Sequence, residues 1–207
     1  MKKILISALL IAAASAAPAY AAGDAVAGKA LYGTCGACHG ANAEGNQAMN
    51  APKLAGQGEW YLFRQLSNFK VGVRGTNAND TFGKTMAPMA MMLADDTAIA
   101  NVAAYITSLP VSQPAATVQG DVSAGKMAYA TCSACHGADG KGNQAMNAPI
   151  LAGQSDFYLV TQLKNFKSGA RGAHAKDSYG MQMASMAKML ADDAAINNVV
   201  AYINTLK

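Results

Sequence analysis

Apolar side chains recur at helical spacing in two stretches of the first half of the chain. Leu62, Leu66 and Phe69 lie three or four residues apart, so they would share one face of a helix spanning about 59–70. A later stripe follows Asp95 and Asp96, acidic residues that favour the start of a helix; its members are Ile99, Val102, Ala103 and Ile106. No segment shows sustained period-two alternation. The pattern therefore predicts an all-α protein.

The rest of this half divides into a helix and two loops. A first helix is expected over about 24–32, with Asp24 as a suitable cap. It would deliver the chain into a turn that carries two cysteines and a histidine. A loop containing Gly, Asn and Pro then runs to Gly56, and Gly72 and Gly75 mark another loop after 59–70.

The second half of the chain repeats the first. Residues 24–109 align with 121–206 without a gap at a constant offset of 97, and the octapeptide at 45–52 recurs unchanged at 142–149. Such self-similarity indicates the tandem duplication of one domain. We place the two domains at 22–111 and 121–207, joined by a short uncharged linker at 112–120.

The first 21 residues have the features of a targeting segment. Lys2 and Lys3 precede an apolar run at 4–17, and Ala19-Tyr20-Ala21 fits an A-x-A cleavage site. The run is shorter than the ~20 residues that a spanning helix needs. We predict a signal peptide at 1–21 and a periplasmic product; an uncleaved membrane anchor is the alternative.

Charge and composition exclude some functions. Without residues 1–21 the chain has 14 basic and 12 acidic side chains, a net charge of +2 that is no signature of nucleic-acid binding. No later stretch is long and apolar enough to cross a membrane, so we expect a soluble product. The apolar side chains are mostly small, and small domains often need a covalent or metal staple.

The motif Cys-x-x-Cys-His occurs once in each half, and it contains all four cysteines of the chain. The first copy is Cys35, Cys38 and His39; the second is Cys132, Cys135 and His136. This is the attachment signature of c-type haem: two cysteines form thioethers, and the adjacent histidine binds the iron. A thioredoxin-like motif would need an α/β setting, which is absent, and a shared zinc site is disfavoured by the 97 residues between the pairs.

The second axial ligand of each iron should come from a residue that the repeat preserves. His174 faces Asn77 in the first half, so it is a poor candidate, whereas methionine sulfur is a known ligand. We favour Met86 and Met183, which begin a segment where methionines recur every three residues; spacing does not separate them well from Met89 and Met186. The remaining matched pairs are Met49/Met146, read as packing, and Met92/Met189.

At these motifs the chain resembles the diheme cytochrome c4 family of bacterial periplasmic proteins. The resemblance includes the Pro-x-Leu-Ala-Gly-Gln blocks at 52–57 and 149–154 and the methionine segments. It implies two tandem cytochrome c-like domains, each wrapped around one covalent haem c with His/Met ligation, and it assigns the methionine ligands to Met86 and Met183. It also implies that Pro52 and Pro149 accept a hydrogen bond from the ligand histidine, and that Gly28 lies where the first and last helices cross.

The resemblance implies a non-enzymatic electron carrier, because an iron with two protein ligands has no open position for substrate. The donor would be a membrane-bound quinol–cytochrome c reductase or a dehydrogenase, and the acceptor a terminal oxidase or reductase. An electron-transfer subunit of a larger periplasmic enzyme is the alternative, and a diheme peroxidase is a weaker one. We expect a monomer, and peripheral membrane association stays open.

Other features are left open by the sequence. Arg74 and Arg171, each in a repeated Arg-Gly turn, would either reach haem propionates or lie solvated in a loop. Two such similar domains can pack about a pseudo-two-fold axis, and we expect them to do so, haem edge toward haem edge. Independent domains on a linker are the alternative.

Overall fold

The computed structural model describes residues 22–207, so the predicted signal peptide at 1–21 lies outside the described residues. The described chain is helical, and the predicted all-α class is confirmed; its only bridge pairings are the isolated Asn46–Ala51 and Asn143–Ala148. The first domain contains α1 (Ala25–His39), η1 (Gln47–Met49), α2 (Glu59–Lys70), α3 (Thr81–Met91) and α4 (Asp96–Ser108). The second contains α5 (Val122–His136), η2 (Gln144–Met146), α6 (Asp156–Ser168), α7 (Ser178–Ala187) and α8 (Asp193–Ile203).

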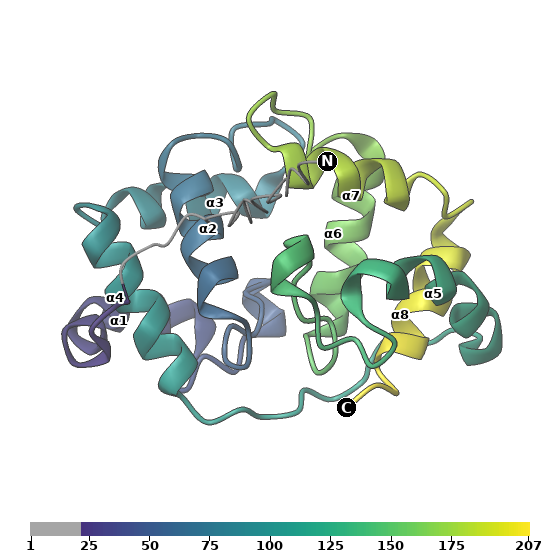
Figure 1. The fold of residues 1–207 in the computed structure, drawn as a ribbon, viewed down its shortest axis with the longest axis horizontal. Helices are drawn as coiled ribbons and strands as arrows, with labels where there is room; N and C mark the ends of the chain where they lie inside the picture. Colours follow the sequence, from purple (N-terminus) through teal and green to yellow (C-terminus); the bar gives the residue numbers. More distant parts are fainter. Residues whose placement is uncertain (1–21) are drawn as a thin grey trace, which may run out of the picture.

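The two domains lie side by side, as Figure 1 shows. Helices α1 and α4 form one outer end of the molecule, and α5 and α8 form the other. Helices α2 and α6 lie toward the middle, and the segment from α4 to α5 runs along one edge without secondary structure. None of the helices in 22–207 is both long enough and apolar enough to span a bilayer.

The first and last helices of each domain cross at a glycine. A Cβ atom added to Gly28 would lie 1.9 Å from the carbonyl oxygen of Asn101, so only glycine allows α1 to approach α4 this closely. Gly125 meets Asn198 of α8 in the same way. The ring of Tyr32 packs against Tyr105 with centroids 5.3 Å apart. The predicted crossing at Gly28 is therefore confirmed.

Helix α1 continues farther than the sequence indicated. The prediction ended it near Tyr32 and placed the cysteine–histidine motif in a turn after it; in the structure the helix continues through Gly33 and Gly36 to His39. The Tyr32 hydroxyl donates to the Gly40 carbonyl at 2.8 Å, which ties the middle of the helix to its end. Gly40, with φ +84°, then ends the helix. The cysteine–histidine motif thus lies on the final helical turns rather than in a turn after them.

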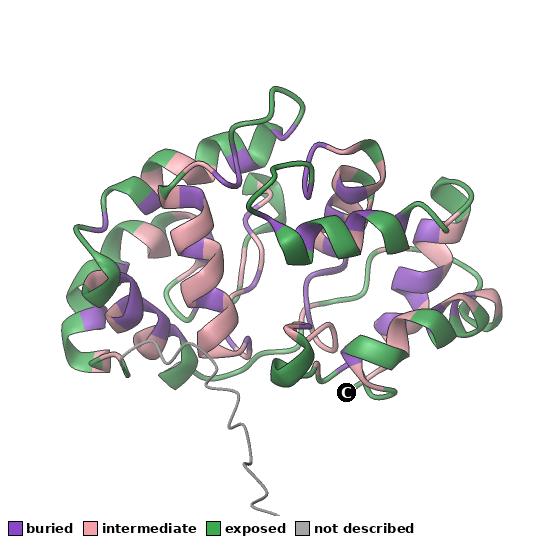
Figure 2. Cartoon of the chain, turned by 45° about the horizontal axis from the view of Figure 1, so that its top comes forward, coloured by how far each residue is buried: buried purple, intermediate pink, exposed green. Residues whose placement is uncertain are grey.

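The predicted apolar stripes form the core. Leu62, Leu66 and Phe69 of α2 are buried, as are the predicted members of the α4 stripe. The corresponding face of α8 is also buried, through Ile196, Val199, Val200 and Ile203. In Figure 2 the buried positions of these helices are purple, and most of their remaining positions are pink, which marks intermediate burial. Burial of such side chains stabilises each domain by about 1.5–3 kcal/mol per residue.

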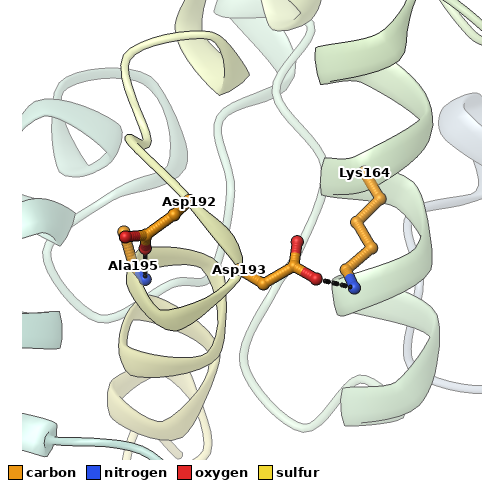
Figure 3. Close-up of polar contacts among 4 residues, drawn as sticks. All are labelled: Lys164, Asp192, Asp193 and Ala195. Carbon is orange, nitrogen blue, oxygen red and sulfur yellow. Dashed lines mark hydrogen bonds and ion pairs between the residues drawn. The ribbon is translucent and has the colours of Figure 1, made fainter.

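The start of α8 is fixed by acidic side chains. Asp192 caps the helix by accepting a hydrogen bond from the Ala195 amide at 2.8 Å, and Asp193 pairs with Lys164 of α6 at 2.6 Å (Figure 3). Both side chains of the ion pair are largely exposed, so the pair contributes less than about 1 kcal/mol. The equivalent cap in the first domain is Asp95, at the helix start that the sequence predicted.

The domains dock through a reciprocal set of hydrogen bonds. Arg74 donates to Tyr158 and Gln162 of the second domain at 3.2 and 2.9 Å. Arg171, the repeat equivalent of Arg74, donates to Tyr61 and Gln65 of the first domain at 3.2 and 2.8 Å. Each residue in one set is the repeat equivalent of its counterpart in the other. The expected packing about a pseudo-two-fold axis is therefore present.

Candidate functional site

Each motif histidine is buried at the end of a helix and braced from behind. The Nδ1 of His39 lies 2.8 Å from the carbonyl oxygen of Pro52, and His136 has the same contact with Pro149. A carbonyl can only accept, so Nδ1 carries the proton. Burial lowers the pKa of both histidines, despite an opposing effect of the carbonyl. The imidazole is therefore neutral at neutral pH, and its Nε2 lone pair remains available to a metal.

The cysteines of each motif lie on the same final turns as the histidine. Cys35 packs against the buried core of the first domain, and Cys132 packs against that of the second. Burial raises the pKa of both thiols, unlike a reactive redox cysteine, whose pKa is lowered. All four cysteines are free of disulfides, and the two pairs end different helices in different domains. This arrangement suits one covalent attachment per domain better than thiol exchange or a shared zinc ion.

The methionine pairs differ in how they are packed. Met86, on α3, packs against the same core cluster as Cys35. Met183, on α7, packs against Phe166 and its cluster. The alternative Met186 is 37% exposed, and the more distant pair Met92 and Met189 are 66% and 67% exposed. Met49 and Met146 are also exposed. Met86 and Met183 are thus the pair of matched methionines that packs against the core in both domains.

The starts of α3 and α7 fix where these methionines lie. The buried Asp80 caps α3 by accepting from the Gly83 amide at 3.0 Å, and the buried Asp177 does the same for Gly180 of α7 at 2.9 Å. A Cβ at Gly83 would lie 2.0 Å from the Asp80 carboxylate, so glycine permits this tight cap. Met86 follows one turn later.

The arginines of the two Arg-Gly turns are buried, so the solvated-loop alternative is wrong. Arg74 and Arg171 are 7% and 8% exposed, and each guanidinium stacks on a phenylalanine ring of its own domain at 4.4 Å. Each also donates to a glutamine of its own domain, Gln65 at 2.8 Å or Gln162 at 2.7 Å. Together with the cross-domain bonds, these contacts close a ring of two arginines and two glutamines on the pseudo-two-fold axis.

This ring brings two like charges close together. Neither Arg74 nor Arg171 forms an ion pair within residues 22–207, and the buried Nε of each has no hydrogen-bond partner there. Burial by itself would raise the pKa of Tyr158, but the charges of both arginines outweigh it and lower that pKa. The two turns also line a half-open hollow of about 230 Å³. Such orphaned donors fit the propionates that a haem brings.

The residues present therefore fit one haem in each domain: a free imidazole nitrogen, two cysteines on the same helical turns, a packed methionine and a buried cation with a spare donor. His174, which the sequence set aside, is indeed exposed and accepts a hydrogen bond from its own loop at Lys176. Sequence reasoning missed Gln65 and Gln162. The repeat keeps both glutamines, but it also keeps Asn68/Asn165 and Lys70/Lys167 on the same helix, so sequence alone did not single them out.

Comparison with known proteins gives consistent matches. The family model described as cytochrome c matches twice, at residues 25–110 and 122–207. The chain is 38% identical over 214 residues to cytochrome c4 of Azotobacter vinelandii, covering 97% of this chain and 98% of that protein. A thiosulfate dehydrogenase electron acceptor from Stutzerimonas stutzeri is 34% identical, covering 77% of this chain and 73% of the relative. The crystal structure of reduced recombinant cytochrome c4 from Pseudomonas stutzeri aligns with a TM-score of 0.69 at 31% identity, covering 90% of this chain and all of that one.

Proposed function

The chain belongs to the cytochrome c4 family, and on that premise we propose that it is a periplasmic carrier that takes electrons from a membrane-bound reductase or dehydrogenase and delivers them to a terminal oxidase or reductase. It is a diheme electron-transfer cytochrome with two covalently attached haem c groups. The observation that supports a carrier most directly is the duplicate construction of the two sites. Each has a neutral buried histidine braced by a proline carbonyl and a packed methionine at the repeat-equivalent position.

We assign the haem contacts by residue. Cys35 and Cys38 attach the haem of the first domain, and His39 and Met86 bind its iron. In the second domain the same roles belong to Cys132, Cys135, His136 and Met183. When bound, each haem supplies an iron that alternates between the ferrous and ferric states.

The protein around each site is suited to that alternation. The His39–Pro52 bond fixes the ring orientation and raises the basicity of the ligand. Apolar side chains exclude water, and thioether ligation favours ferrous iron and so a high potential. A histidine and a methionine would hold each iron, and this would leave no position for a substrate. The mature chain is then a carrier rather than an enzyme, and its partners are redox proteins.

A second candidate function is supported by one of the relatives. That relative is named as the electron acceptor of thiosulfate dehydrogenase. For this chain the alternative is a stable electron-transfer subunit of a larger periplasmic enzyme. The distinguishing experiment is purification from native periplasm by size: a carrier elutes as a monomer, whereas a subunit elutes with its enzyme.

The carrier proposal is tested by electron delivery. The purified mature protein, reduced with ascorbate, is mixed with oxygenated membranes from the native host, and its visible spectrum is followed. We expect rapid reoxidation of both haems that stops when the terminal oxidase is inhibited with cyanide. Failure of the membranes to reoxidise the protein, with rapid turnover of added hydrogen peroxide instead, would replace the carrier with a peroxidase.

A further inference from the structure

The loops that contain Pro52 and Pro149 differ in their contacts across the domain interface. In the second domain this loop, residues 147–155, offers its backbone carbonyls to side chains of the first domain at three places. Arg64 donates to Asn147 O at 3.1 Å, Gln57 to Ile150 O at 2.6 Å, and the Lys53 ammonium to Gly153 O at 2.8 Å. Ile150 directly follows Pro149, whose carbonyl braces His136. These three cross-domain hydrogen bonds therefore hold the loop that braces the proposed iron ligand.

The equivalent loop of the first domain, residues 50–58, has no matching set of cross-domain hydrogen bonds to its carbonyls. Its described backbone makes one cross-domain hydrogen bond, in which the Lys53 amide donates to the Ser155 hydroxyl at 3.2 Å. Lys53 and Arg64 are replaced in the second domain by Ile150, which has no side-chain donor, and Thr161, whose hydroxyl donates to Phe157 O of its own helix at 2.8 Å. Gln154 keeps the amide of Gln57 but directs its oxygen to the neighbouring Ser155 amide at 2.8 Å. The asymmetry thus follows from particular residues in an otherwise symmetric interface.

We propose that Lys53, Gln57 and Arg64 are positioning residues for the second iron site, so that the site at His136 depends on the first domain more than the site at His39 depends on the second. Arg64 holds Asn147 at two points, since its other nitrogen donates to the Asn147 side chain at 2.7 Å. Gln57 and Lys53 are themselves buried, so their bonds are shielded from competing water.

The electronic consequence rests on the proposed haem ligation. A histidine whose Nδ1–H bonds firmly to a carbonyl is a more basic ligand. Freeing the Ile150 peptide loosens the neighbouring Pro149 carbonyl, weakens that bond, and makes His136 a poorer donor to ferric iron. The potential of the second haem should then rise. Docking of the domains therefore affects the potential of the second haem more than that of the first. A partner protein that disturbs the domain interface would change that one potential selectively.

The test uses the full haem-loaded protein and a matched pair of variants, Gln57→Ala and Gln154→Ala. Amide hydrogen exchange is read at equivalent protected amides: Leu151 and Ala152, which bond to Gly140, and Leu54 and Ala55, which bond to Ala43. We expect Gln57→Ala to speed exchange at Leu151 and Ala152 by roughly five- to tenfold, as for the loss of one buried hydrogen bond, with a much smaller change at Leu54 and Ala55. Gln154→Ala should change neither pair comparably.

A second variant, Arg64→Thr, gives the first domain the residue that the second carries at that position, and it should act in the same direction at Leu151 and Ala152. Each haem's potential is measured alongside by a titration in which the two haems are resolved by NMR. A rise confined to the His136 haem in Gln57→Ala agrees with the proposal. Equal effects of Gln57→Ala on both loops, or an equal effect of Gln154→Ala on the first loop, would overturn it. Amide hydrogen exchange does not report on the iron ligands. The proposal about the loops can therefore fail while the His/Met ligation stands, and the ligation can fail while the proposal about the loops stands.

Discussion

Replacing Gln162 with leucine should open the buried ring at the domain interface. Its side-chain oxygen accepts from Arg74 at 2.9 Å and from Arg171 at 2.7 Å, and leucine of similar size leaves both charged donors without it. A hydrogen bond to a charged group is worth about 1.5–3 kcal/mol, so two such bonds sum to about 3–6 kcal/mol. The loss is limited by domain separation, since undocked arginines regain water. We therefore expect the variant to undock before either domain unfolds.

The assay is urea unfolding of the haem-loaded protein, followed by the fluorescence of Trp60. This is the only tryptophan, and it lies on α2 beside Tyr61, a residue of the interface. Gln162→Leu should add an early transition or lower the midpoint, and Gln65→Leu should do the same because it holds the equivalent place in the ring. The double variant should lose less stability than the sum of the losses in the two single variants, since breaking the ring at one glutamine already opens it.

Thr161→Val serves as the control for this experiment. It lies on the same helix, and within residues 22–207 its hydroxyl bonds to the local Phe157 carbonyl alone. It should leave the transition within about 0.5 kcal/mol of the parent. The closed ring would be refuted if the single-glutamine variants lost as little stability as Thr161→Val. It would also be refuted if the stability losses of the two single variants added fully in the double variant.

The remaining predictions concern the ligand, a cap and a helix crossing. Met86→Ala should abolish the methionine–iron charge-transfer absorption of one haem and lower its potential, whereas Met89→Ala should leave both unchanged in the same visible spectra. Burial by itself would raise the pKa of Asp156, but hydrogen bonds from linker amides outweigh it and lower the pKa. The contribution of this carboxylate to folding stability is therefore full above the unfolded pKa near ~4 and is lost as pH falls. Asp156→Asn should destabilise the protein by about 1–3 kcal/mol at pH 7 and flatten the acid limb of a stability–pH curve. Gly28→Ala should destabilise by about 1–3 kcal/mol or more in thermal unfolding, because its Cβ meets the α4 backbone, whereas Gly33→Ala on the same helix meets nothing within 4 Å and should stabilise by up to about 1 kcal/mol.

Much of the fold was predictable because its signals are local. The stripe through Leu62, Leu66 and Phe69 requires only helical periodicity, and α2 has the predicted bounds of 59–70. The start of α4 after Asp95 follows from capping chemistry. The predicted end of α1 was wrong: the cysteine–histidine motif was expected in a turn, whereas the chain stays helical through Gly33 and Gly36 to His39, with the Tyr32 hydroxyl bonded to the Gly40 carbonyl. Propensity is a weak guide where tertiary contacts compete with it.

Some features of the candidate site could be predicted from the sequence, and others could not. Two cysteines and a histidine within five residues can be recognised from sequence, because one helical end carries all of them. The ring at the interface could not be, since Arg74 and Gln162 are 88 residues apart and meet only after both domains fold and dock. The choice of Met86 over Met89 needed a resemblance at the sequence level and stays a prediction, because both side chains are partly buried, although Met86 packs against the core cluster of the first domain.

The central claim is that this chain carries two haems of His/Met ligation that exchange single electrons. The most direct measurement is a spectroelectrochemical titration of the purified mature protein, followed at the methionine–iron charge-transfer band of the ferric form. We predict two one-electron steps, each removing about half of the band on reduction, and two haems that stay attached when the protein is denatured. A single step, a haem without the band, or haem lost on denaturation would contradict the account.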